Sequence, residues 1–105
     1  DGTTCTLTGL LRPSGLLILP NGDLLIADTG CHRVIRVDSR GLWTNVAGAA
    51  GRSGSSGDGG VAPQALLNEP SGLALDSAGN LYISDTANHR VRRIDSRGII
   101  STFAG

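Results

Sequence analysis

The chain has 105 residues, and nine basic side chains balance nine acidic ones to give a formal net charge of zero. That length limits it to one small domain, and the charge balance gives no support to a nucleic acid or an acidic surface as a partner. No apolar run approaches the about 18 residues of a membrane-spanning helix. The first residues lack the basic start and apolar core of a signal peptide, so none is expected.

The composition is typical of short strands joined by many turns. All nine basic residues are Arg, eight of the nine acids are Asp, and 16 residues are Gly. Helical surfaces favour Glu and Lys, whereas turns favour Asp and Gly.

Two copies of one repeat make up most of the chain. Pro13–Gly48 aligns without a gap on Pro70–Gly105, and nineteen of the 36 paired residues are identical. Residues 2–9 (GTTCTLTG) align with the last eight residues of each copy, so we interpret them as the tail of a preceding repeat. Self-similarity at this level indicates a repeat architecture.

Each repeat is expected to form four strands. They are Leu16–Leu19, Leu24–Ala27, Arg33–Val37 and Leu42–Ala47 in the first copy, and Leu73–Asp76, Leu81–Ser84, Arg90–Ile94 and Ile99–Ala104 in the second. The first two strands of each copy are apolar at most positions, as in a buried sheet, whereas the third alternates apolar residues with Arg, as in a half-exposed strand. Four-stranded units with a buried inner edge and a polar outer edge are typical of propeller blades.

The second repeat, PSGL … GNLYISDTANHRVRRID … GIISTFAG, closely resembles the NHL repeat. The segment GDGGVAPQALLNEP before it is similar to the connector of bacterial and teneurin-type NHL proteins. The resemblance covers essentially the whole chain. It implies an all-β fold, a β-propeller segment of NHL type with two four-stranded blades plus an extra outer strand. NHL propellers usually have six blades, so other chains or a longer chain would complete the ring.

The chain therefore divides into four parts. Residues 1–9 are the fourth strand of a preceding blade, 10–48 are blade 1, 49–69 are a Gly/Ser-rich linker, and 70–105 are blade 2. The linker has 21 residues, whereas the equivalent link before blade 1, residues 10–12, has three. Residues 51–60 are expected to be flexible, and 61–68 to form a short helical turn that packs Ala65, Leu66 and Leu67 on the blades. A long loop is often functional, but an inherited family linker is the preferred interpretation.

Two blades leave two blade faces uncovered, and repeat arrays need about three units to bury their core. Three chains would make six blades, but the leading strand would then be redundant. That strand, Thr3, Thr4, Cys5, Thr6 and Leu7, could instead pair with an open edge of a neighbour and build a filament. The third alternative is that this chain is part of a longer propeller.

The leading hypothesis is a non-enzymatic structural or protein-interaction module that assembles through blade packing and edge-strand pairing. Its partners would be copies of itself or further blades. The expected apolar contact residues are Leu7, Leu16, Ile18, Leu24, Ile26, Leu73, Leu75, Leu81, Ile83 and Phe103.

The motif Asp-Thr-x-x-His-Arg occurs once in each repeat. It supplies Asp28, His32, Arg33, Asp85, His89 and Arg90. We expect the Asp side chains to accept backbone N–H bonds and the His and Arg side chains to bridge neighbouring blades. Because the two His residues would lie one to a blade, a metal site is not favoured and no cofactor is expected.

Two other functions are kept as alternatives. Peptide-amidating lyases with NHL-like propellers bind metal in the central channel, which makes a metal-dependent enzyme or ligand binder the first, although no residue here matches such a site. RNA binding is the second, because some NHL propellers bind RNA and five arginines lie on the third strands: Arg33, Arg36, Arg90, Arg92 and Arg93. We expect these arginines to face solvent beside Asp partners, and aromatic side chains that would stack on RNA bases are missing.

The two cysteines, Cys5 and Cys31, have no counterpart in the other repeat. They could pair with each other, be free or link chains. A disulfide would imply an oxidising compartment, and an extracellular or secreted location is favoured. Thr3, Thr4, Thr6 and Thr8 are candidate O-glycosylation positions in that setting.

Overall fold

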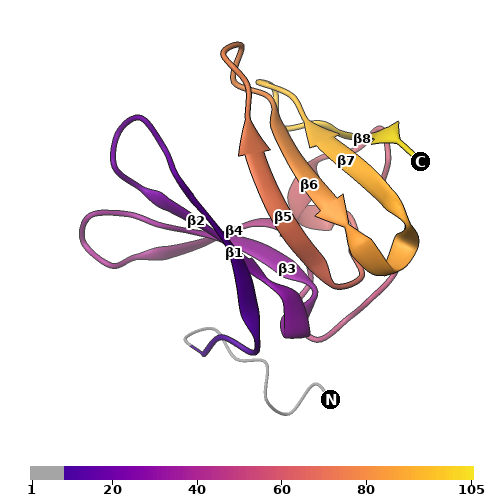
Figure 1. Cartoon of the computed structure of the whole chain (residues 1–105), viewed down its shortest axis with the longest axis horizontal. Coiled ribbons are helices and arrows are strands. Elements are labelled where there is room, and N and C mark those ends of the chain that lie inside the picture. The colour runs from indigo at the N-terminus through magenta and orange to yellow at the C-terminus, as the bar shows by residue number, and fades with distance from the viewer. Residues whose placement is uncertain (1–8) are drawn as a thin grey trace.

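The computed structural model describes residues 9–105, which form two four-stranded antiparallel sheets, each with its strands in chain order (Figure 1). Blade 1 consists of β1 (Pro13–Ile18), β2 (Leu24–Asp28), β3 (Arg33–Val37) and β4 (Trp43–Gly48). Blade 2 consists of β5 (Pro70–Leu75), β6 (Leu81–Asp85), β7 (Arg90–Ile94) and β8 (Ile100–Ala104). The expected all-β fold with two four-stranded blades is confirmed.

Short 3₁₀ turns join the second and third strands of each blade. They are η2 (Thr29–Cys31) in blade 1 and η4 (Thr86–Asn88) in blade 2. The hairpins between third and fourth strands close on an Asp–Gly pair: Asp38 Oδ1 accepts the backbone N–H of Arg40 at 2.9 Å and of Leu42 at 3.0 Å, while Gly41 has a φ of 83°. Gly tolerates this φ, and the Asp satisfies the backbone of the turn, so the strands reverse within four residues.

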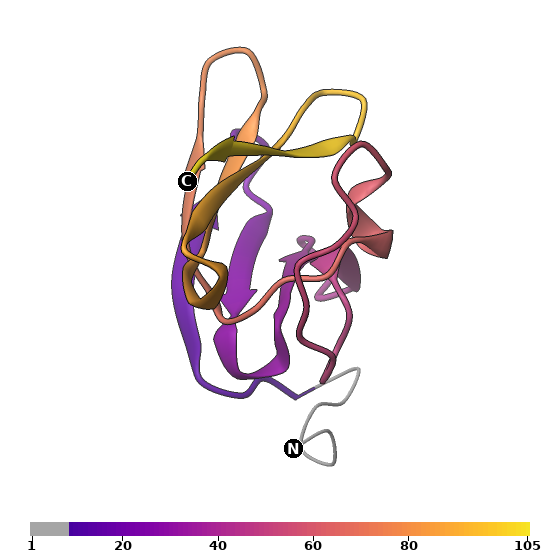
Figure 2. The same ribbon diagram turned by 90° about the vertical axis from the view of Figure 1, so that its right-hand side faces the viewer.

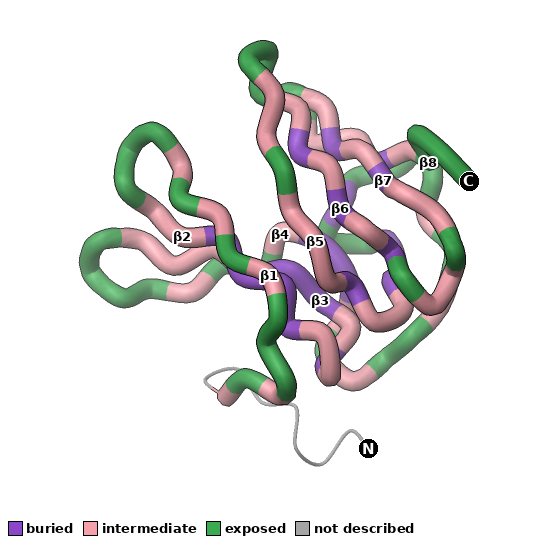
Figure 3. Tube along the Cα trace, in the orientation of Figure 1, coloured by how far each residue is buried: buried purple, intermediate pink, exposed green. Residues whose placement is uncertain are grey.

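The apolar core lies between the two blades. One face of blade 1 contributes Leu25 and Val34, which pack against Ile83 and Ile100 of blade 2. Figure 3 shows the buried residues concentrated on the central strands, with the hairpin tips exposed. The core is therefore an interface between repeats, as the physics of repeat proteins requires.

The opposite faces of both blades are uncovered in the described part of the chain. Leu16 and Ile18 of β1 are 69% and 70% exposed, and Phe103 of β8 is 58% exposed. Leu16 and Ile18 thus lie on one of the two blade faces that a two-blade chain was expected to leave uncovered. Alternate residues of a strand point to opposite faces, and the face that bears Leu16 and Ile18 has no described blade packed on it.

The linker folds against the outer strands of both blades, as Figure 2 shows from the side. Its 3₁₀ turn η3 (Ala62–Gln64) is shorter than the turn expected over 61–68. Ala65 and Leu67 are fully buried. The Gly/Ser tract, which we expected to be flexible, is held by backbone hydrogen bonds, with Leu66 N–H donating to the carbonyl of Ser56 at 3.0 Å.

No helix among residues 9–105 is long and apolar enough to cross a membrane.

Among the described residues, Asp76 has the most strongly shifted pKa. Its carboxylate accepts the side-chain N–H of Asn80 at 2.9 Å, the backbone N–H of Asn80 at 2.9 Å and the hydroxyl of Tyr82 at 2.9 Å. These hydrogen bonds, first the one from the Asn80 side chain, lower the pKa of Asp76 from 3.8 to about 2. A carboxylate is stabilised in its charged form by such donors.

We expect an NMR titration of the side-chain carboxyl to place the pKa of Asp76 near 2, and the Tyr82→Phe variant to raise it. Because the pKa is depressed in the folded state, the stability that Asp76 contributes is fully present above pH 3.8 and is lost as the pH falls through about 2. A titration midpoint near 3.8 in the wild-type chain would contradict the hydrogen-bonded turn.

Candidate interaction surfaces

Polar contacts join blade 1 to blade 2 beside η2. Thr29 Oγ1 donates to the carbonyl of Pro70 at 2.7 Å, and His32 Nδ1 accepts the backbone N–H of Glu69 at 3.1 Å. His32 and Glu69 are held at φ values of 59° and 54°, in the left-handed region. The contact thus has two matched halves: a hydroxyl and an imidazole on blade 1, and, at the start of blade 2, the carbonyl of Pro70 and the backbone N–H of the linker residue Glu69 before it.

The same halves recur on the two uncovered faces. Thr86 and His89 occupy the positions of Thr29 and His32, are exposed, and His89 has a φ of 56°. On the opposite side of the molecule Arg12 occupies the position of Glu69 with the same φ of 54°, and both Arg12 and Pro13 are exposed. The uncovered face of blade 2 therefore repeats the backbone geometry of the covered face of blade 1. The uncovered face of blade 1 repeats that of the covered face of blade 2.

The two motif aspartates are fully buried and tie each connector to its own blade. Asp28 accepts the backbone N–H of Leu11 at 2.7 Å and Arg33 Nε at 2.8 Å. Asp85 accepts the backbone N–H of Asn68 at 2.8 Å and Arg90 Nε at 3.2 Å. The structure brings Asp and Arg of each motif together within a blade and keeps the two motifs apart. Among residues 9–105 no cluster of three His, Cys, Asp or Glu side chains is placed to hold a metal ion.

Two of the third-strand arginines are buried, so the expectation that all of them face solvent is wrong. Arg33 is 4% exposed and Arg92 is 0% exposed. Arg92 donates to Asp58 Oδ1 at 3.0 Å, to the carbonyl of Leu66 at 2.9 Å and to Asp85 Oδ2 at 3.4 Å. A buried cation needs such partners, and once paired it is not part of a basic face for RNA.

Sequence reasoning missed Asp58, which stands alone in a Gly-rich tract. In the structure it binds Arg92, accepts the hydroxyl of Thr102 at 2.6 Å and lies 3.8 Å from Arg90. Arg92 replaces Ile35 of the first repeat, and only the second repeat has a long linker before it. An arginine present only in the repeat that follows the long linker was the one sequence feature that could have indicated an ion pair between Asp58 and Arg92.

The uncovered faces differ in chemistry. The face of blade 1 is aliphatic at β1, through Leu16 and Ile18. The face of blade 2 is aromatic and cationic: Tyr82 and Phe103 pack edge to face with ring centres 4.9 Å apart, and the guanidinium of Arg93 lies 5.9 Å from the Phe103 ring centre. Aromatic and arginine side chains are the types enriched at protein interfaces.

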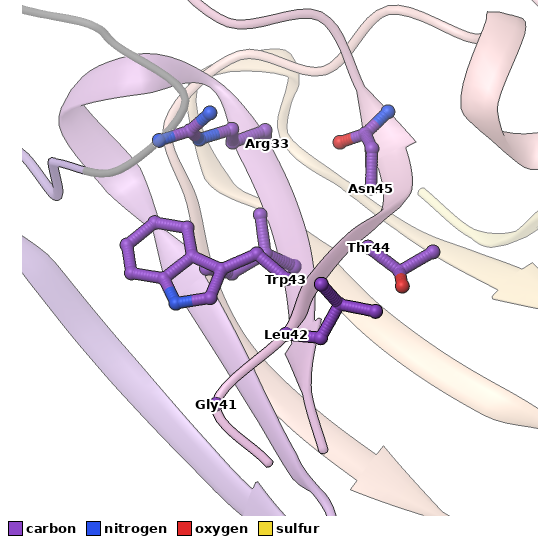
Figure 4. A pocket seen from close by; sticks show the side chains of 7 residues that line it. Arg33, Gly41, Leu42, Trp43, Thr44 and Asn45 are labelled. Carbon is purple, nitrogen blue, oxygen red and sulfur yellow. The ribbon is translucent and has the colours of Figure 1, made fainter.

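The outer part of the uncovered face of blade 1 is hollowed by a pocket of about 370 Å³, which we call the β4 pocket (Figure 4). Its lining residues are Arg33, Ile35, Gly41, Leu42, Trp43, Thr44 and Asn45. The guanidinium of Arg33 lies 6.0 Å from the ring centre of Trp43, which is the range of a cation–π contact.

Several predicted positions lie outside the described residues. They are Thr3, Thr4, Cys5, Thr6, Leu7 and Thr8. The leading strand, the O-glycosylation positions and the pairing of Cys5 with Cys31 therefore stay predictions. Cys31 itself is buried in η2.

The family model of the teneurin NHL domain matches residues 44–105. Teneurin-3 of Mus musculus is 35% identical over an alignment of 96 positions that covers 80% of this chain and 4% of that protein. NHL repeat-containing protein 2 of Gallus gallus is 35% identical over an alignment of 98 positions that covers 91% of this chain and 13% of that protein. The chain thus spans only a small part of these relatives.

Two solved structures have a similar fold. A Bacteroides thetaiotaomicron protein of unknown function matches with a TM-score of 0.78 at 26% identity, over 92% of this chain and 25% of that one. Virginiamycin B lyase from Staphylococcus aureus matches with a TM-score of 0.63 at 16% identity, over 89% of this chain and 27% of that one, which shows the fold alone.

Proposed function

The chain belongs to the NHL-repeat family of β-propeller proteins, and on that premise we propose that it is a protein-interaction module whose two uncovered faces each take up a further blade. The observation that carries the proposal is the repetition of the blade contact. Thr86 and His89 on one face, and Arg12 and Pro13 on the other, reproduce the halves that join the two blades of the chain.

A second copy of the chain supplies what each face lacks. Its Pro13 carbonyl would accept from Thr86, and its Arg12 N–H would donate to His89, as Pro70 and Glu69 do within the chain. The contact is head-to-tail, so it closes into a ring if the rotation per blade fits and otherwise grows as a filament. Three copies would complete six blades. Blades supplied by a longer polypeptide would use the same two faces.

The apolar side chains on these faces favour such docking. Leu16 and Ile18 occupy the positions at which blade 2 has Leu73 and Leu75, and those two side chains pack against the core between the blades. Covering apolar area of this kind contributes roughly 25 cal/mol per Å².

Native mass spectrometry and sedimentation of the 105-residue chain over a range of concentrations test the self-docking form of the proposal. We expect particles of more than one chain, with three chains as the ring and an open series of masses as the filament. A single chain at every concentration up to the millimolar range would overturn docking between copies.

Gly72→Ala is expected to weaken this assembly at least about tenfold while leaving the fold of the chain unchanged. Within the chain, a Cβ at Gly72 would come only to 2.9 Å from Ser84 Oγ, which can rotate away. At the equivalent Gly15, a Cβ would overlap the carbonyl oxygen of Ser71 in the next blade. In a head-to-tail contact Gly72 would meet Ser14 of the next copy in the same way. Ser77→Ala, on an exposed hairpin tip, is the control, and unchanged assembly of Gly72→Ala would contradict the geometry.

A further inference from the structure

The β4 pocket of blade 1 has a counterpart on blade 2, and there the linker fills it. The matching positions of blade 2 are Arg90, Arg92, Gly98, Ile99, Ile100, Ser101 and Thr102. The linker pairs with this edge through its backbone: Gly59 N–H donates to the carbonyl of Ile100 at 2.8 Å, Ile100 N–H donates to the carbonyl of Gly60 at 3.0 Å, and Ala62 N–H donates to the carbonyl of Gly98 at 2.9 Å.

Side chains complete the binding of the linker to blade 2. Asp58 reaches inward: its Oδ1 lies 2.8 Å from Nη2 of Arg92, and its Oδ2 accepts the hydroxyl of Thr102 at 2.6 Å. Arg90 and Arg92 also donate to the carbonyls of Ser55 and Ser56. A Gly-rich turn with one side chain pointing toward the blade thus occupies this site, held by hydrogen bonds to the backbone of the outer edge.

The connector before blade 1 is too short to do the same. It has three residues, 10–12, where the linker has 21. It is also fixed at the far end of the blade, because Leu11 donates to Asp28 and accepts the backbone N–H of Gly30 at 2.7 Å. Trp43 pairs with Val37 as Ile100 pairs with Ile94, so its N–H and C=O project from the outer edge in the same way.

The pocket differs from its counterpart in the chemistry of its floor. Ile35 stands where blade 2 has Arg92, Trp43 where it has Ile100, and Asn45 where it has Thr102. The charge of Arg33 is matched by Asp28 at 2.8 Å. The cation that binds Asp58 on blade 2 is therefore replaced by the aliphatic Ile35, beside the aromatic Trp43.

We propose that the β4 pocket binds a loop of a partner protein, which hydrogen-bonds to the backbone of Gly41 and Trp43 and places an apolar side chain where the linker places Asp58. Other copies of this chain are a poor source, because their linker is already bonded to their own blade 2. The inference does not depend on assembly of blades, since the site lies within blade 1 of one chain.

Trp43 is the only tryptophan of the chain, so its fluorescence reports on the pocket. The probes are two synthetic peptides with the sequence of residues 54–67, one with the native Asp58 and one with Asp58→Leu. We expect the Leu peptide to change the emission of Trp43 saturably and the Asp peptide to bind at least about tenfold more weakly. The amide NMR signals of residues 41–45 are expected to shift with the Leu peptide.

Ile35→Arg places an arginine in blade 1 where blade 2 has Arg92. We expect this variant to bind the peptide with Asp58 more tightly than the Asp58→Leu peptide. Ile35→Val is the matched control and should keep the preference of the wild type. If Ile35→Arg does not fold, the comparison of the two peptides on the wild-type chain decides alone. Equal binding of both peptides, or no saturable change at millimolar Leu peptide, would overturn the proposal. It would also be overturned if the chain's own residues 1–8 gave NMR contacts to Trp43 that the peptide cannot displace.

Discussion

Replacing Arg92 with isoleucine, the residue at the matching position of blade 1, is expected to lower the free energy of unfolding by about 3 kcal/mol. Arg92 and Asp85 are both 0% exposed and lie 3.4 Å apart. Removing the arginine takes one cationic partner from the buried carboxylate of Asp85. It also removes the donor to the carbonyl of Leu66. A buried acceptor without a partner costs about 1–3 kcal/mol by itself. We expect a loss near the lower end of the range for a broken buried ion pair, because Asp85 still accepts hydrogen bonds from Arg90 and Asn88.

Urea unfolding followed by circular dichroism measures this loss, with Ile35→Val as the control in blade 1, expected to cost about 1 kcal/mol. Hydrogen exchange adds a readout specific to the linker, because residues 54–60 should lose protection in Arg92→Ile and keep it in Ile35→Val. A loss below about 1 kcal/mol together with unchanged protection would mean that Arg92 does not hold the linker.

Gly15→Ala is the second substitution with a large expected effect, a loss of about 3 kcal/mol. A Cβ at Gly15 would overlap the backbone carbonyl oxygen of Ser71 and press on the Cβ of Ala27 at 3.2 Å. The carbonyl of Ser71 belongs to the backbone of β5 and cannot rotate away as a side chain can, so the two blades would have to separate. Their separation would expose the core that Leu25 and Ile83 share.

The matched control is Gly72→Ala at the same position of blade 2, where the new Cβ would meet only a serine side chain. We expect its free energy of unfolding, measured at a concentration at which the chain is a monomer, to stay within about 1 kcal/mol of the wild type. Equal destabilisation by the two substitutions would show that the cost arises within a blade and not from the contact between blades.

The strands and the blade count were predictable because they depend on residues close together in the chain. The turn at Asp38–Gly41 and its copy at Asp95–Gly98 reverse the chain within four residues, and the strands between such turns alternate in a way that the repeat displays twice. The burial of individual strand residues was not predictable by the same means. Leu16 and Leu73 are identical residues at matching positions, yet only Leu73 has a blade packed on its face.

The sequence by itself therefore determined the repeat, the four-stranded blade and the motif aspartates, since these arise from local hydrogen bonding and from the period of apolar residues. Only the tertiary structure decided that the linker folds back along the outer edge, that Asp58 meets Arg92 across 34 positions of the chain, and that blade 1 has a pocket where blade 2 has a bound segment. These contacts join residues that are distant in sequence, and their geometry is set by the packing of one blade on the next.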